Sequence, residues 1–265
     1  MQKLLRVLTL NIWNRSGPWD KRLPLLRAGL ERVAADVVGV QEDIQTGEGS
    51  LSADMSAGLG YERVFGVAHD LGGGVHFGNA ILSRWPITKS EICPLPQGTS
   101  AEHRSVIFAE IASPHGALPF FCTHLNWKFH EAAVRELQVQ RIAEIVKERA
   151  PMTGLPAILV GDFNAEPEAT AIRFLKGLHA IDGKSVFFAD SFAQAGEGPG
   201  YTFDARKNPF AGPTHEYPRR IDYVFVRGPD KDVRGKPVAS KVCFDEVVDG
   251  VCATDHFGVV SDVTI

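Results

Sequence analysis

The order of the predicted elements favours an α/β fold in which two packed β-sheets carry helices on their outer faces. Short apolar segments of strand length recur along the whole chain, and several follow one another like hairpins, as residues 61–67 and 77–83 do around the Gly-rich turn at 71–74. Amphipathic segments interrupt these strands. No repeat, low-complexity tract or linker divides the sequence, so residues 1–265 are predicted to form a single domain.

The individual elements follow from hydrophobic spacing. In the segment 20–35, Leu23, Leu26, Leu30 and Val33 recur at helical spacing, and the segment 131–148 has the strongest helical pattern. Two further helices are expected at 51–59 and 168–177. Strands are expected at 4–13, 36–41, 61–67, 77–83, 88–95, 105–111, 118–124, 156–163, 221–227, 238–244 and 258–263. The Gly- and Pro-rich stretch 193–216 is expected to be a long surface loop.

Bulk properties narrow the class of protein. Hydrophobic residues make up 44% and charged residues 23%, which is the balance of an ordinary globular protein. The net charge of −4 argues against a main function in gripping long nucleic acid, although it leaves room for a local basic pocket. The longest apolar runs are too short to cross a bilayer. The apolar stretch at the N-terminus is short and is interrupted by Asn11, so it is interpreted as a first strand and not as a signal peptide.

The four cysteines lie far apart and lack the spacing of a metal site. Cys122 falls within an apolar strand pattern and is expected to be a small core residue. Free thiols at all four positions would fit a reducing compartment, and we therefore expect the protein in the cytoplasm.

The most informative feature is the repeated placement of polar residues at the ends of predicted strands. These residues are Asn11, Glu42, His124, Asp162, Asn164, Asp222, Asp255 and His256. A residue at a strand end is held by a rigid scaffold and still faces a cleft, as a catalytic group must. Each residue taken alone could be a solvated loop residue or a turn cap. The joint set predicts an active site.

Two segments of this set carry most of the chemistry. In GDFN, strand alternation directs Asp162 and Asn164 to one side and Phe163 into the core. A carboxylate and an amide aimed at one point suit Mg²⁺, or the orientation of a water beside a phosphate. Asp255 and His256 place a carboxylate next to an imidazole, and Asp222 on a separate strand could orient that imidazole and raise its pKa.

The segments LTLNIW, VGVQE, GNAILSRWPI, CTHLNW, GDFNAEP, RRIDYVFV and TDHFGVV occur in this order between residues 8 and 260. The chain therefore resembles the endonuclease/exonuclease/phosphatase superfamily, and its fold is expected to be the four-layered α/β sandwich of deoxyribonuclease I. His124 stands where abasic-site endonucleases carry tyrosine. The chain is in this respect closer to the histidine-containing phosphodiesterase branches.

The resemblance implies a role for each site residue. Glu42, with Asn11 nearby and help from Asp255, would hold a Mg²⁺ ion, for which Mn²⁺ could substitute. Asp162 would position or deprotonate the attacking water, and Asn164 would bind the phosphate or the nucleophile. His256, oriented by Asp222, would stabilise the transition state or act as the base, and His124 would contact a phosphate oxygen or assist the leaving group. Whether Asp162 or His256 is the base stays open at this stage.

Three further residues are candidates for substrate binding. Arg104 opens a strand whose neighbour ends at His124, and its guanidinium could hold a phosphate with two hydrogen bonds. Arg220 shares a face with Asp222 by strand alternation, and Asn126 follows His124 in the segment CTHLNW. Trp127 could line the substrate cleft, but packing under the following helix is slightly favoured.

The sequence thus predicts a Mg²⁺-dependent hydrolase of phosphate esters, with diesters favoured over monoesters by analogy alone. Two alternatives stay open. A nuclease would need basic side chains clustered around the cleft; the candidates are Lys128, Arg135, Arg206, Lys207 and Arg220. A catalytically inactive binding module of the same fold is disfavoured because none of the expected polar positions is lost. The oligomeric state is not predicted.

Overall fold

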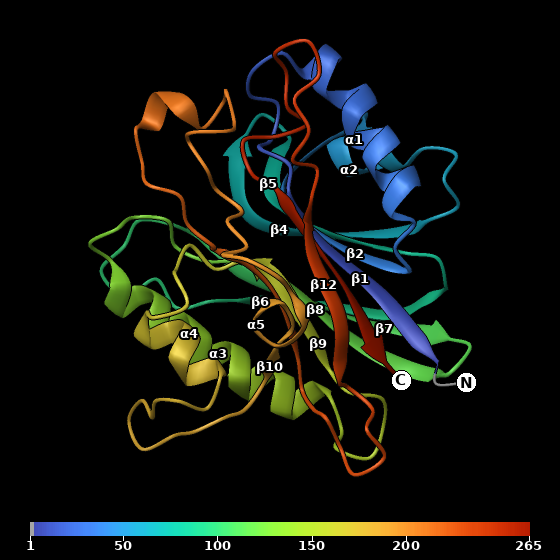
Figure 1. Ribbon diagram of the computed structural model, residues 1–265, viewed down its shortest axis with the longest axis vertical. Coiled ribbons are helices and arrows are strands. Elements are labelled where there is room, and N and C mark those ends of the chain that lie inside the picture. Colours follow the sequence, from blue (N-terminus) through green and yellow to red (C-terminus); the bar gives the residue numbers. More distant parts are fainter. Residues whose placement is uncertain (1–2) are drawn as a thin grey trace.

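A computed structural model describes residues 3–265 and arranges them in four layers (Figure 1). One sheet has the strand order β12-β13-β1-β2-β5-β4, with the short β3 paired to β2, and the other has the order β10-β11-β9-β8-β7-β6. In Figure 1, α1 and α2 lie above the two sheets and α3 and α4 lie below them. The four-layered sandwich predicted from the sequence is confirmed.

The bounds of the elements agree with the hydrophobic patterns to within a few residues at most ends. The strands of the first sheet are β1 (Leu4–Asn11), β2 (Val37–Thr46), β3 (Gly49–Ser50), β4 (Glu62–Gly72), β5 (Val75–Ser83), β12 (Pro237–Cys243) and β13 (Gly258–Thr264). Those of the second are β6 (Ile87–Pro94), β7 (Ser105–Ser113), β8 (Gly116–His124), β9 (Ile158–Asp162), β10 (Ala189–Asp190) and β11 (Asp222–Val226). The helices are α1 (Trp19–Val33), α2 (Leu51–Ser56), α3 (Ala132–Arg149), α4 (Thr170–Leu175), α5 (Ser191–Ala195) and the 3₁₀ turn η1 (Gly212–Thr214).

Three apolar clusters separate the four layers. The faces of the two sheets meet in a core that includes Val7, Ile107, Cys122 and Val160. A second cluster packs α1 and α2 on the first sheet, and a third packs α3 and α4 on the second. The central strands are buried on both faces, which explains why they are almost continuously apolar in sequence.

Close approach of the two sheets depends on Gly39 in β2. A methyl group at this position would overlap the side chain of Val160 on the facing sheet. Glycine is therefore required there by the space between the layers, since the backbone of β2 is otherwise regular at this point.

The topology brings the predicted site residues to one edge of the sandwich. Strand β1 runs parallel to β2, with Asn11 opposite Gln41, and β8 runs parallel to β9, with His124 opposite Asp162. Strand β11 runs antiparallel to β9, so that its first residue, Asp222, lies beside Asp162. The ends of strands from both sheets thus meet at the same place.

Candidate active site

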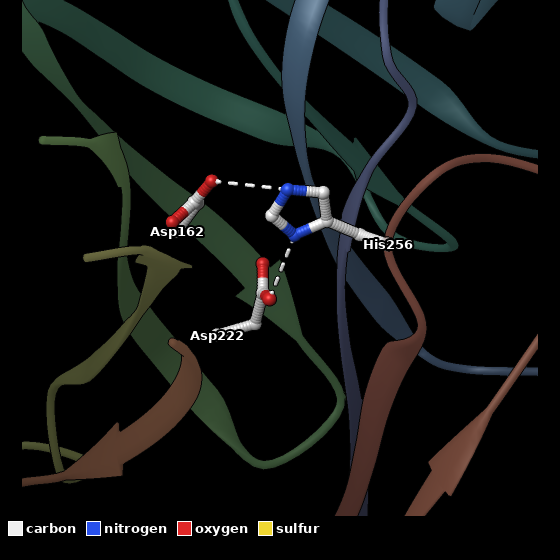
Figure 2. Close-up of side chains that lie close together, drawn as sticks. All are labelled: Asp162, Asp222 and His256. Carbon is white, nitrogen blue, oxygen red and sulfur yellow. Dashed lines mark hydrogen bonds and ion pairs between the residues drawn. The ribbon is translucent and has the colours of Figure 1, made fainter. Parts of the chain in front are cut away.

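A chain of three buried side chains forms the centre of the site. Nδ1 of His256 lies 2.9 Å from Oδ2 of Asp222, and Nε2 of the same ring lies 3.7 Å from Oδ2 of Asp162 (Figure 2). At most 6% of any of these three residues is exposed. Figure 2 shows the imidazole between the two carboxylates, each of which faces a different ring nitrogen. The prediction that Asp222 orients His256 therefore agrees with the geometry.

The charges of this chain are set by burial and by neighbours. Burial opposes a charged imidazole, but Asp222 and Asp162 together raise the pKa of His256 well above its usual range. Burial and the nearby Asp222 raise the pKa of Asp162 to about 7, although His256 works in the opposite direction. The raised pKa favours the imidazolium form of His256 at neutral pH, and the pKa of the Asp162 carboxyl lies near neutrality.

Asp162 is held by neighbours on both of its oxygens. Nδ2 of Asn11 donates to Oδ2 of Asp162 at 3.0 Å, and the backbone N–H of Asn164 donates to Oδ1 at 2.9 Å. Asn164 adopts a left-handed conformation with φ of 48°, which ends β9 in a tight turn. Its side-chain Nδ2 lies 3.0 Å from Nε2 of His124. The GDFN segment therefore links the ends of β1, β8 and β9.

His124 completes this side of the site as a neutral ring. Burial, and after it the positive charges of Arg104 and His256, lower the pKa of His124 well below its usual value. Its Nε2 faces Asn164, and its Nδ1 is buried without a hydrogen-bond partner among the described residues. A buried ring nitrogen without a partner is costly. This position is open to a polar ligand atom.

Glu42 owes its position to a bulge in β2. The pairing of β2 with β5 shifts register between Val40 and Asp43, and Glu42 has a left-handed φ of 59°. A bulge re-aims the side chain that regular alternation would turn toward the helix layer. Asn11 donates to Oε1 of Glu42 at 3.2 Å, and Asn14 donates to Oε2 at 2.8 Å. The carboxylate is thereby held at the edge where the two sheets meet.

Asp255 lies close enough to Glu42 for the charge of Glu42 to affect its pKa. Burial raises the pKa of Asp255 to about 6; His256 opposes this shift, and the negative charge of Glu42 adds to it. Two carboxylates that repel each other in a partly buried place offer the hard oxygen ligands that a divalent cation prefers. The donor set thus fits the expected metal, with Glu42 and Asp255 as its carboxylates. Asn11, as it lies, uses its amide nitrogen on Glu42 and Asp162, and its oxygen accepts from the backbone of Trp13.

Arg22 is a fully buried arginine that hydrogen-bonds to the loops next to Asn11 and Asp255. It donates to the carbonyl oxygens of Ile12, Asn14, Ser16 and Ala253. Its guanidinium carbon lies 5.0 Å from the ring centroid of Trp13 and 5.4 Å from that of Trp19. The loop after β1 and the loop before β13 are therefore joined by one side chain.

Sequence reasoning missed both Arg22 and Asn14. Asn14 has a weak signal, since it follows Asn11 by three residues in the segment LNIWN. Arg22 has none, because it lies in the first turns of an amphipathic helix, where an arginine is usually solvated.

The three predicted substrate-binding residues have different surroundings. Arg104 is 6% exposed, and its Nε has no partner among the described residues, while a terminal nitrogen lies 3.4 Å from Glu102. Burial lowers the pKa of Arg104, and the charges of Glu102, Glu42 and Asp162 oppose this shift. Arg220 donates both of its terminal nitrogens to Asp190 at 2.9 Å each, and so forms a buried ion pair with the strand β10.

The role expected for Asn126 also differs from its environment. Its Nδ2 donates to Ser100, its Oδ1 accepts from the backbone of Lys128, and the side chain is fully buried. Both ends of the amide hold the loop after β8. The contacts of Asn126 use both ends of its amide, and those of Arg220 use both of its terminal nitrogens, so we leave both residues out of the proposed site. Trp127 is 54% exposed, so packing under the following helix, which the sequence slightly favoured, is wrong.

Four of the five basic side chains that a nuclease would need are held by carbonyl oxygens or carboxylates of the described residues. Arg135 is buried and donates to backbone carbonyls, Lys128 lies 3.6 Å from Glu131, and Arg220 is paired as described. Arg206 pairs with Asp204, and with Lys207 it lines a cavity of about 910 Å³. None of the predicted site residues lines that cavity.

The fold and the arrangement of the strand-end residues together define the class of protein: the chain has a deoxyribonuclease I-like fold. It belongs to the Endonuclease/Exonuclease/phosphatase family, whose model matches residues 8–256. The resemblance drawn from the ordered motifs is thus confirmed.

The chain is also similar to individual proteins and structures. The chain is 32% identical to the Escherichia coli K12 protein YbhP over 178 residues, which are 60% of this chain and 66% of that protein. It thus spans slightly under two thirds of the curated relatives that it matches. A family protein from Bacteroides thetaiotaomicron has a TM-score of 0.79 at 19% identity and covers 100% of this chain and 99% of its own.

A structure of D. rerio TDP2 complexed with single strand DNA product has a TM-score of 0.76 at 21% identity, with 99% and 100% of the two chains covered. At these identities the structural likeness establishes the fold. In residues 3–265 no helix is long and apolar enough to span a membrane.

Proposed function

We propose that the protein is a Mg²⁺-dependent phosphodiesterase that hydrolyses its substrate by in-line attack of water. The observation that carries this proposal is the buried chain Asp162–His256–Asp222 beside the carboxylates of Glu42 and Asp255. It combines a proton acceptor, a cation and a place for a metal at one edge of the fold.

Glu42 and Asp255 would hold the metal ion, with Mn²⁺ as a substitute for Mg²⁺. When bound there, the ion would neutralise charge that develops on the phosphate. Asn11 and Asn14 would keep the Glu42 carboxylate in place through their amide N–H groups. This arrangement assigns Asn11 to the support of the site and leaves Glu42 as the principal ligand.

Asp162 is the better candidate for the general base. A base must be deprotonated when water attacks, and a carboxyl with a pKa of about 7 satisfies this near neutral pH. His256 has a raised pKa and is already protonated there, so it cannot accept the proton. Its Nε2 would instead donate to a phosphate oxygen and stabilise the transition state, while Asp222 holds Nδ1.

Arg104 and His124 would bind the phosphate from the other side. The Nε of Arg104 and the Nδ1 of His124 are both buried and without partners among residues 3–265. Nδ1 of the neutral His124 ring would carry a proton if its Nε2 accepts from Asn164. Both groups would then donate to phosphate oxygens, and Asn164 would keep His124 in the correct orientation.

A diester fits this set of charges better than a monoester. The phosphate of a diester carries one negative charge, whereas a monoester carries about two near neutral pH. Arg104 and His256 supply two cationic side chains, and they already face Glu42, Asp162 and Asp222. The nuclease alternative has weaker support, because four of the five basic side chains named for it are held by carbonyl oxygens or carboxylates. An inactive binding module has none, because every expected catalytic group is present.

We also propose a domain organisation and a cellular location. We infer that residues 1–265 form one domain, because both sheets share one apolar core. We place the protein in the cytoplasm, since all four cysteines are buried free thiols, as expected in a reducing compartment.

The function is tested by a hydrolysis screen in Mg²⁺ or Mn²⁺ over bis-aryl phosphate, aryl phosphate, sphingomyelin, oligonucleotides and inositol phosphates. We expect metal-dependent turnover of a diester that is lost in D162N and H256A. Turnover of monoesters alone would overturn the diester assignment. Activity that survives in D162N would overturn the role of Asp162.

A further inference from the structure

Three exposed aromatic side chains lie in chain segments that adjoin residues of the proposed active site. Trp127, Phe129 and Tyr217 are 54%, 55% and 58% exposed. Large aromatic residues usually bury most of their surface, so three exposed ones in one neighbourhood call for an explanation. We refer to Trp127, Phe129 and Tyr217 as the aromatic rim.

Each member of the aromatic rim is connected to a catalytic element. Trp127 follows His124 by three residues at the end of β8. The hydroxyl of Tyr217 donates to Glu166, which lies two residues after Asn164. Phe129 faces Arg219, whose guanidinium carbon lies 4.7 Å from the Phe129 centroid and 5.3 Å from the centroid of Phe203.

The ring of Phe203 contacts His256. It packs edge-on against the imidazole, with 5.2 Å between the ring centroids. Phe129, Arg219, Phe203 and His256 therefore form a continuous stack that runs from the surface into the site. In Figure 1 the loop that leads into α3 lies at the left, and the segment 203–220, in orange, lies above it.

The loop that carries Trp127 and Phe129 is held in place before any substrate binds. Arg135 donates to the carbonyl oxygens of Asn126, Lys128 and Phe129, and Asn126 is fixed to Ser100. Arg219, which supports the inner face of Phe129, is 7% exposed and also pairs with Glu216. A rigid aromatic surface loses little conformational entropy when a flat ligand stacks on it.

We propose that the aromatic rim binds a planar aromatic group of the substrate, a nucleobase or an aryl ring, attached to the phosphate held at His256. This inference rests on the proposed function and narrows its substrate class. Stacking on an aromatic side chain accepts any flat ring and needs no cluster of basic residues. Stacking thus fits the net charge of −4 and the paired arginines better than the binding of a long duplex does.

The test compares kcat/KM on three diesters in Mg²⁺: a thymidine dinucleotide, the same dinucleotide with both bases replaced by hydrogen, and bis(4-nitrophenyl) phosphate. The variants are W127A and F129A, with F129Y to keep the ring. F187A is the matched control, because Phe187 is also 54% exposed but lies in the segment between α4 and β10. Stacking contributes about 1–3 kcal/mol per base, or about 5- to 150-fold in binding.

We expect W127A and F129A to lose at least about fivefold in kcat/KM on the dinucleotide, the aryl ester or both, while F129Y and F187A keep wild-type values. A loss on one aromatic ester alone identifies the natural ring as a base or as an aryl group. An equal loss on the base-free diester, or no loss on either aromatic ester, would overturn the proposal.

Binding of thymidine 5′-phosphate separates this proposal from the catalytic one. If the wild type hydrolyses none of the diesters, the proposed function fails. The aromatic rim is then still tested, because calorimetry must show weaker binding of thymidine 5′-phosphate by W127A and F129A than by F187A. Equal affinities in all three variants would refute the aromatic rim as a binding surface.

Discussion

Replacing Asp222 with Asn tests how the proton is handled in the active site. The change keeps the size of the side chain and removes the charge that faces Nδ1 of His256 at 2.9 Å. A hydrogen bond between charged groups contributes about 1.5–3 kcal/mol. We therefore expect kcat of D222N to fall about 10- to 150-fold at neutral pH, with a small change in KM.

The pH profile of D222N decides between the two candidate bases. Asp222 raises the pKa values of both His256 and Asp162, so its loss should move both limbs of the profile to lower pH. If Asp162 is the base, the alkaline limb reports deprotonation of the His256 imidazolium. This limb would then shift down by about 1–2 pH units, which is the same 1.5–3 kcal/mol expressed as a pKa change.

The assay is kcat against pH from 5 to 10 on bis(4-nitrophenyl) phosphate at saturating Mg²⁺. If His256 were the base, activity would need the neutral ring. The wild type would then be limited by its raised pKa, and D222N would gain activity at neutral pH. A gain in D222N, or an alkaline limb that stays in place, would refute the assignment of Asp162.

Three further predictions concern the metal loops and the core. The variant R22M loses the hydrogen bonds of Arg22 to carbonyl oxygens, and calorimetry should show that it binds Mg²⁺ about 10- to 100-fold more weakly. The control is R27M, which also lies on α1 and loses two hydrogen bonds to the carbonyl oxygens of Asp54 and Ala57; it should bind Mg²⁺ as the wild type does. The ionised Asp255 destabilises the metal-free fold above its raised pKa of about 6, and this penalty fades as the pH falls toward 4. D255N should therefore be about 1–3 kcal/mol more stable than the wild type in urea at pH 7 without metal, and equal to it near pH 4. G39A should lose about 1–3 kcal/mol through overlap with Val160, while G47A, which meets open space, should not.

Each of these expectations has a plain contrary result. Equal Mg²⁺ affinity in R22M and R27M would show that the loops keep their positions without Arg22. A D255N variant that gains no stability at pH 7 would mean that burial and the charge of Glu42 do not destabilise the ionised Asp255. Equal urea midpoints for G39A and G47A would contradict the tight spacing of the two sheets.

The sequence predicted the fold well because the pattern of strands is strong. The central strands are buried on both faces, and their apolar runs are hard to mistake. The two-residue strand β10 and the short helix α5 escaped notice, since neither is long enough to produce a period. This omission had a consequence for the site. Asp190 in β10 binds Arg220, and without that strand Arg220 looked free to meet a substrate.

The residues at the strand ends were predictable for a similar reason. Parallel pairing brings His124 beside Asp162, and strand β11 returns on the other side of β9 to place Asp222 next to Asp162. The direction of Glu42 was less accessible, because it depends on a bulge with a left-handed residue. The partners of a buried arginine such as Arg22 lie far away in the sequence, and no local pattern predicts them.

The central claim is that Glu42 holds the metal while Asp162 handles the proton, and parallel titrations of E42Q and D162N test it most directly. Mg²⁺ affinity is measured by calorimetry, and turnover of bis(4-nitrophenyl) phosphate is measured on the same samples. We predict that E42Q loses both turnover and at least about 100-fold in Mg²⁺ affinity. D162N should lose turnover but keep its Mg²⁺ affinity within a few-fold, because the carboxylate oxygens of Asp162 face Asn11, Asn164 and His256 and not the proposed metal ligands. Wild-type Mg²⁺ affinity in E42Q, or turnover within tenfold of the wild type in D162N, would contradict the claim.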